Sequence, residues 1–103
     1  MTALYRLLAD AEADLRAIIR YTRKEWGEAQ ARDYAAKLKL CIEGMVAGDA
    51  GAKDMGALYP GLQMMRCEYH FIFCLFSDDA PALVVALLHE RMDLMARLAD
   101  RLR

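Results

Sequence analysis

Residues 62–89 read LQMMRCEYHFIFCLFSDDAPALVVALLH and contain three runs that are rich in aromatic, β-branched and other large apolar residues. The runs cover 62–67, 69–77 and 83–89, and they are separated by a polar break near Glu68 and by the turn sequence SDDAP at 77–81. Short apolar runs bounded by turn residues are typical of strands joined by hairpins. The stretch therefore predicts three antiparallel strands in meander order.

The middle run is apolar on both of its faces. Because side chains alternate along a strand, one face would carry Tyr69, Phe71, Phe73 and Leu75, and the other His70, Ile72, Cys74 and Phe76. An antiparallel sheet usually shows one face to water, so both faces of this one need a cover. We expect helices to cover one face fully and the other only in part, which would leave an apolar docking groove.

Residues 10–48 predict two helices. Apolar residues follow helical spacing from Ala11 to Trp26, with Asp10 as the expected N-cap and Trp26 as a core residue between the helices. Gly27 would end this helix, and a second apolar stripe continues to a stop near Gly48. Two helices separated by one glycine predict an antiparallel hairpin.

The remaining segments complete the expected order. A short apolar run at 4–8 predicts a first strand, and 48–61, with four of the six glycines, predicts the long connection from helices to sheet. A stripe of Met and Leu from 92 to 102 predicts a short C-terminal helix. The fold class is therefore α+β, a single domain over 1–103 in the order β-α-α-β-β-β with a terminal helix.

Composition and charge exclude several classes of protein. Apolar residues make up 57% of the 103, which is high for so small a domain and suggests that part of its surface needs a partner. Charged residues are 28%, which argues against a disordered chain. The formal charge of −1 is spread evenly without a basic stripe, so we expect no sequence-specific nucleic-acid binding.

The start of the chain and its cysteines point to a cytoplasmic location. No signal peptide is recognisable, and the longest apolar run, 82–88, is too short to span a membrane. Cys41, Cys67 and Cys74 form no Cys-x-x-Cys pair, and only two histidines could join them around a metal. We expect three unpaired core cysteines in a reducing cytosol, with no metal site and no cofactor.

The order of elements and the amino-acid sequence itself resemble those of ParE toxins of the RelE/ParE superfamily, including those of a broad-host-range plasmid stabilisation system. Residues 11–27 (AEADLRAIIRYTRKEWG) resemble the first ParE helix, and 84–102 (VVALLHERMDLMARLADRL) resemble the C-terminal part. Shorter matches lie at 30–34, 53–55, 65–67 and 70–74. The resemblance covers nearly the whole chain, and its last stretch is the most specific part.

This resemblance implies the toxin of a type II toxin–antitoxin system. Such a toxin would bind DNA gyrase, stabilise cleaved DNA and block replication, and a ParD-type antitoxin with a ribbon-helix-helix DNA-binding part would neutralise it. It would act by binding and not as an enzyme.

Two alternatives remain open. One is a ribosome-dependent mRNA endonuclease of the RelE branch that uses Arg66, His89 and Arg91, because histidine can transfer protons near neutral pH and arginine can bind phosphate. Against it, Lys53 is the only lysine after Lys39, so no basic cradle for RNA is evident. The other alternative is a relative that has lost toxicity and keeps antitoxin binding.

We predict two binding surfaces and no catalytic residue or metal ligand. His70 is expected to be partly buried and bonded to backbone. The predicted partner-binding residues are Arg66, His70, Phe71, Phe73, His89, Arg91, Met92, Met95 and Leu98. The predicted gyrase-contact residues are Arg16, Arg20 and Arg23 in the first helix.

Overall fold

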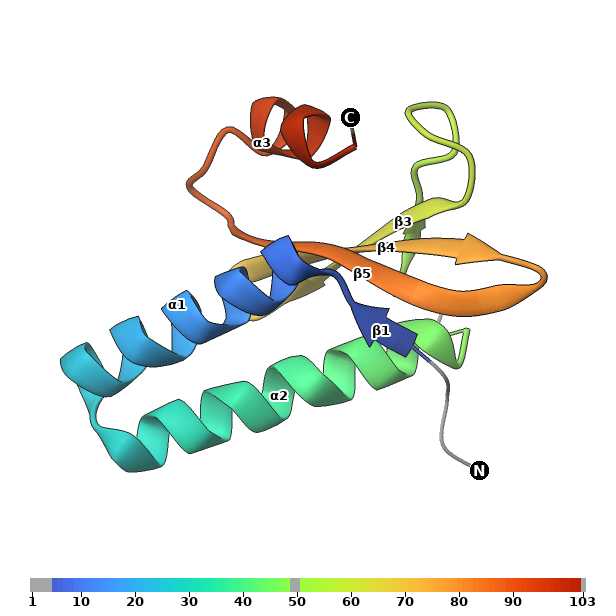
Figure 1. Cartoon of the computed structure of the whole chain (residues 1–103). Helices are drawn as coiled ribbons and strands as arrows, with labels where there is room; N and C mark the ends of the chain where they lie inside the picture. Colours follow the sequence, from blue (N-terminus) through green and yellow to red (C-terminus); the bar gives the residue numbers. More distant parts are fainter. Residues whose placement is uncertain (1–4, 49–50, 103) are drawn as a thin grey trace.

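The computed structural model of the protein describes residues 5–48 and 51–102 and has three layers. A helical hairpin covers one face of a five-stranded sheet, and a short third helix covers the other face (Figure 1). The elements in chain order are β1 (Tyr5–Leu7), α1 (Ala9–Trp26), α2 (Glu28–Val46), β2 (Lys53–Asp54), β3 (Leu62–Cys67), β4 (His70–Ser77), β5 (Ala80–His89) and α3 (Leu94–Arg101).

The sheet has the strand order β1-β5-β4-β3-β2. The predicted meander is confirmed, because β4 is antiparallel to both neighbours, with His70 opposite Cys67 on β3 and His89 on β5. Two features were not predicted. β1 pairs in parallel with β5, which makes the sheet mixed, and β2 adds a two-residue edge strand inside the glycine-rich connection. Residue 4 of the predicted first strand lies outside the described residues.

Gly27 joins the two helices as predicted. Its φ of 95° is a conformation that glycine adopts without steric cost, and its N–H donates to the Arg23 carbonyl at the end of α1. The predicted cap at the start of α1 is wrong. The helix begins at Ala9, so Asp10 lies inside the first turn, where its charge still favours the helix dipole.

The core consists of two clusters on opposite faces of the sheet. Ile72 and Cys74 of β4 face the hairpin and pack with residues such as Leu38 and Met45 of α2. Phe73 faces the other way and packs with Leu98 of α3. The predicted alternation along β4 is confirmed.

The expectation that α3 leaves this second face open is wrong for Phe73 and Leu98, which are both 0% exposed. The helix is short, but Leu94, Leu98 and Leu102 stand at four-residue spacing and point together onto the sheet. Asp93 caps the helix, since its side chain accepts from the Ala96 N–H. Eight ordered residues are therefore enough to cover the centre of the face.

The hairpin extends past the end of the sheet (Figure 1). Between the projecting parts of the helices, the buried residues are the small Thr22 and Ala31. The prediction that Trp26 fills the core is therefore wrong, and its side chain is 72% exposed.

The prediction of three unpaired cysteines is also wrong. Cys41 of α2 and Cys67 of β3 form a disulfide with a Cα–Cα distance of 6.2 Å, and Cys74 alone is free. Burial raises the pKa of the Cys74 thiol to about 12. The argument from unpaired cysteines for a reducing cytosol loses its basis, because disulfides are rare there.

Two features are absent from the described residues. Over 5–48 and 51–102, no helix has the length and apolar character that a membrane crossing requires. The same residues contain no group of three or more His, Cys, Asp or Glu side chains that could hold a metal ion.

Candidate partner-binding surface

The position of α3 is fixed by an ion pair that reaches across the molecule. Both terminal nitrogens of Arg101 donate to the Asp14 carboxylate of α1, at 2.8 and 2.7 Å. Asp14 also accepts from the Leu87 N–H at 3.0 Å, and Arg101 donates to the Val85 carbonyl at 3.2 Å. Because β1 ends at Leu7, the Val85 carbonyl and the Leu87 N–H on the outer side of β5 have no neighbouring strand to bond with. The side chains of Arg101 and Asp14 supply these two hydrogen bonds instead.

This contact was not predicted from the sequence. Asp14 and Arg101 lie 87 residues apart, and each also suits its position on its own helix, so no local pattern marks the pair. The hydrogen bond with Asp14 is the largest cause of the raised pKa of Arg101, so the guanidinium stays charged.

The outer side of α3 exposes methionine. Met92 and Met95 are 44% and 49% exposed, whereas Leu98 is fully buried against the sheet. Methionine side chains are flexible and polarisable and adapt to different partners. Of the three predicted residues in this segment, the two methionines are therefore accessible in the free protein.

Arg66 lies on the α3 side of the sheet and is exposed. It forms an ion pair with Glu90, donates from Nε to the Glu68 carbonyl at 3.2 Å, and lies over the Phe71 ring at 5.7 Å from the centroid. Phe71 is half-buried beneath it. We call Arg66, Phe71, Met92 and Met95 the α3-face patch.

His70 and His89 lie on the other side of the sheet, next to the hairpin. The Tyr34 hydroxyl of α2 accepts from the Tyr69 N–H at 3.2 Å and lies 2.6 Å from His70 Nδ1, to which it donates when His70 carries its proton on Nε2. Nδ1 of His89 accepts from the Arg91 N–H at 3.1 Å, so the neutral His89 ring carries its proton on Nε2. His70 is partly buried as predicted, but it bonds to a side chain and not to backbone.

The surroundings of His70 favour its uncharged state. Burial first, and then the neighbouring His89, whose ring centroid is 5.1 Å away, together lower the pKa of His70 to about 4. Burial also raises the pKa of Tyr34. At neutral pH, Tyr34 and His70 thus form a fixed, neutral contact between α2 and the β3–β4 turn.

The three residues of the nuclease alternative do not converge on one point. Arg66 lies on the α3 side and is paired with Glu90, whereas His89 lies on the hairpin side against His70. Arg91 follows the end of β5 and is exposed. The sheet itself therefore separates the phosphate-binding candidate from the proton-transfer candidate.

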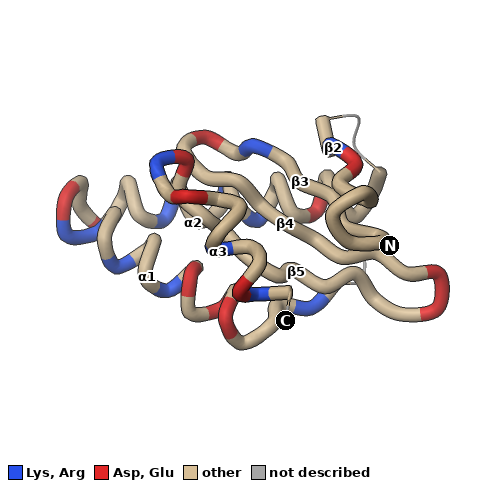
Figure 2. The backbone as a smooth tube through the Cα atoms, turned by 90° about the horizontal axis from the view of Figure 1, so that it is seen from above, with Lys and Arg blue, Asp and Glu red and all other residues tan. Residues whose placement is uncertain are grey.

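The arginines of α1 are exposed on the hairpin, which carries both positive and negative residues (Figure 2). Arg16 pairs with Glu12 at 3.8 Å and Arg23 with Glu28 at 2.6 Å. Arg20 has no ion-pair partner within 5–48 and 51–102.

The chain matches, over residues 5–94, a family described as the ParE toxin of the type II toxin–antitoxin system parDE. It belongs to the ParE toxin family. Toxin ParE of Escherichia coli is 63% identical over 103 residues, which are 100% of this chain and 99% of that protein. Toxin ParE1 of Caulobacter vibrioides is 33% identical over 95 residues, 91% of this chain and 96% of that protein.

A solved structure supports the fold. It is described as the chromosomal ParDE TA system from P. aeruginosa, and one of its chains superposes with a TM-score of 0.69 over 85% of this chain and 96% of that one. The sequence identity is 12%, so this likeness shows the fold alone.

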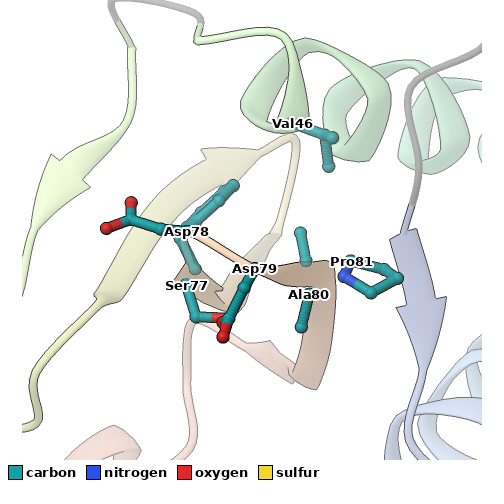
Figure 3. Close-up of a pocket in the computed structure, with 8 residues that line it drawn as sticks. Val46, Ser77, Asp78, Asp79, Ala80 and Pro81 are labelled. Carbon is teal, nitrogen blue, oxygen red and sulfur yellow. The ribbon is translucent and has the colours of Figure 1, made fainter.

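In this member of the ParE family the predicted partner-binding residues fall into two groups. Those on the α3 side include the α3-face patch and, buried beneath it, Phe73 and Leu98. His70 and His89 face the hairpin. A separate hollow of about 500 Å³ lies between Val46 and the β4–β5 turn, with Asp78 and Asp79 on that turn (Figure 3), and none of its lining residues was a candidate.

Proposed function

We propose that this ParE family member inhibits replication in the cytoplasm by binding DNA gyrase and stabilising cleaved DNA. The proposal rests on the 63% identity to Escherichia coli Toxin ParE along the whole chain. Binding alone is sufficient for this activity, so the proposal assigns no catalytic residue, metal or cofactor.

The hairpin is the proposed gyrase-contact surface. The end at which α1 passes into α2 lies beyond the sheet (Figure 1). Arg20 and Arg23 lie in the last two turns of α1, and Arg16 lies one turn earlier. Arg20 is the strongest candidate, because it can form a new ion pair without breaking an existing one.

A ParD-type antitoxin is the proposed neutralising partner, and the α3-face patch is its proposed contact. The patch comprises two accessible methionines and an arginine that lies over Phe71, and Met, Arg and aromatic residues are enriched in protein interfaces. Arg66 could exchange its Glu90 partner for an antitoxin carboxylate.

A gyrase supercoiling assay with the purified protein tests the proposal. We expect lost supercoiling and accumulated cleaved DNA at micromolar protein, and relief of both by the ParD-type protein encoded beside it. Arg20→Ala should weaken inhibition several-fold, whereas Lys39→Ala removes one exposed charge from α2 as a matched control. Normal supercoiling at micromolar excess would contradict the proposal.

Two further assays separate the alternatives. An endonuclease would cut messages in a translating extract, and cutting would be lost in His89→Ala. A relative without toxicity would leave growth unaffected when the folded protein is expressed alone in a sensitive cell. Gyrase inhibition without message cleavage is the expected combination.

A further inference from the structure

The disulfide lies in the seam between α2 and the end of β3. Three different links cross this seam: the Cys41–Cys67 disulfide, the Tyr34–His70 hydrogen bond, and an ion pair between Lys37 and Glu68 at 3.4 Å. Tyr34, Lys37 and Cys41 follow at three- and four-residue spacing and so share one side of α2. One covalent link therefore reinforces two non-covalent ones.

The two sulfurs of the disulfide differ in accessibility. Cys67 is 4% exposed and lies in the core cluster beneath the hairpin. Cys41 is only partly buried, on the solvent-facing margin of that cluster. Thiol–disulfide exchange requires a thiolate to reach one of the two sulfurs, so access selects Cys41.

We propose that Cys41 is the site at which low-molecular-weight thiols of the glutathione class open this disulfide, which makes the α2–β3 link a redox-controlled lock. The thiolate attacks Cys41 Sγ and forms a mixed disulfide there, while Cys67 leaves as the thiolate and takes up a proton. A second thiolate then attacks the mixed disulfide, releasing the oxidised small-molecule disulfide and the Cys41 thiol. Two electrons pass from two small thiols to one protein disulfide.

Reduction of the Cys41–Cys67 disulfide removes one of the three links between α2 and β3 and leaves the other two in place. The disulfide closes a loop over a sequence separation of 26, and its loss returns conformational freedom to that segment mainly in the unfolded state. The Tyr34–His70 and Lys37–Glu68 contacts remain, so the reduced protein is expected to fold with lower stability. This regulation does not depend on gyrase being the target.

Peptide mapping of the full chain tests the site of attack. Cys41 and Cys67 fall in different tryptic peptides, because Lys39, Lys53 and Arg66 are cleavage sites between and beside them. In the Cys74→Ala variant, which removes the third thiol, we expect a cross-linked pair of peptides after acid quenching without reductant. Brief exposure to reduced glutathione should place the mixed disulfide on the Cys41 peptide. Free thiols before reduction, or glutathione found first on Cys67, would overturn the proposal.

Two single variants provide the matched comparison. With oxidised glutathione, Cys67→Ala should be modified at Cys41 at least about tenfold faster than Cys41→Ala is modified at Cys67, because only Cys41 is accessible. Equal rates would show that accessibility does not control the exchange.

Thermal unfolding tests the lock itself. Reduction should lower the Tm of the wild type and of Cys74→Ala by about 10 °C or more, and should not affect the double variant Cys41→Ala/Cys67→Ala. A wild-type Tm that stays within about 2 °C on complete reduction would show that the link does not act as a lock.

Discussion

Burial keeps the His70 side chain, which connects β4 to α2, uncharged at neutral pH. The ring accepts a hydrogen bond from Tyr34 and lies edge-on against His89. Protonation at Nδ1 would remove the acceptor and place a charge in a partly buried site. The α2 seam is therefore sensitive to acid at this residue.

The first prediction concerns pH. Because the pKa of His70 is about 4 in the folded protein and near its ordinary value of 6.5 when unfolded, the unfolded chain binds more protons between these values. Its contribution to stability is present above about pH 6.5 and is lost as pH falls toward 4. We expect a loss on the order of 1–2 kcal/mol, about half of what the full shift would give, because part of the ring contacts solvent.

Urea unfolding at several pH values measures this loss. His70→Gln keeps a hydrogen-bond acceptor without the titration, so its stability should change less than that of the wild type between pH 7 and 4.5. Parallel pH profiles of the two proteins would show that His70 does not contribute.

The second prediction at this scale concerns Asp14. Asp14→Asn should lower the free energy of unfolding by about 2–4 kcal/mol, because Arg101 loses its charged partner in a mostly buried site. Asp10→Asn is the control, since Asp10 is 3.8 Å from Arg101 and 74% exposed, and should cost less than about 0.5 kcal/mol. Equal losses in the two variants would contradict the assignment.

Residue-level contacts were the least predictable part of the structure. Side-chain alternation along β4 followed from the sequence, because period-two patterning is local. The Cys41–Cys67 pairing and the Asp14–Arg101 contact did not, because each joins residues that become neighbours only through the tertiary fold. Spacing along the chain carries no signal for such contacts.

At the scale of elements, α3 combines a buried side with an exposed side. Leu98→Ala should cost about 2–4 kcal/mol, because Leu98 is fully buried against Phe73 and Leu88 and its truncation leaves a cavity. Met95→Ala, one turn earlier and half exposed, should stay within about 0.5 kcal/mol. Urea unfolding of both variants measures the difference, and similar losses would show that α3 does not pack as described.

Elements with strong periodicity were predicted well. β3 covers 62–67 as predicted, and α1 ends before Gly27 as predicted. β2 was missed because two residues among glycines carry no strand pattern, and the cover provided by α3 was underestimated because it depends on where Arg101 docks. The local sequence pattern determines whether a segment forms a helix or a strand, whereas the area that it covers depends on residues elsewhere in the chain with which it packs.

For the whole molecule, stability should be distributed unevenly along the hairpin. The end of the hairpin where α1 passes into α2 projects beyond the sheet (Figure 1), and the buried residues nearest to this end are Thr22 and Ala31. Regions with few buried contacts open locally at low free energy. We expect faster amide hydrogen exchange there than over 34–46 of the same hairpin, as measured by mass spectrometry. Uniform protection of the amides along the hairpin would contradict this expectation.

Trp26→Ala should change the global free energy of unfolding by less than about 0.5 kcal/mol, because Trp26 is 72% exposed.

During synthesis the Asp14–Arg101 contact can form only after nearly the whole chain has been made. Its two side chains are added 87 residues apart, an interval of about 4–17 s at typical translation rates. Near the end of that interval, once Leu88 has been added and until Arg101 follows 13 residues later, the sheet face with Phe73 and Leu88 has no helical cover. Over the same last part the outer groups of β5 at Val85 and Leu87 lack Arg101. A nascent chain at this stage presents an apolar surface that the finished protein hides, so chaperones or a waiting partner would meet a different molecule from the released one.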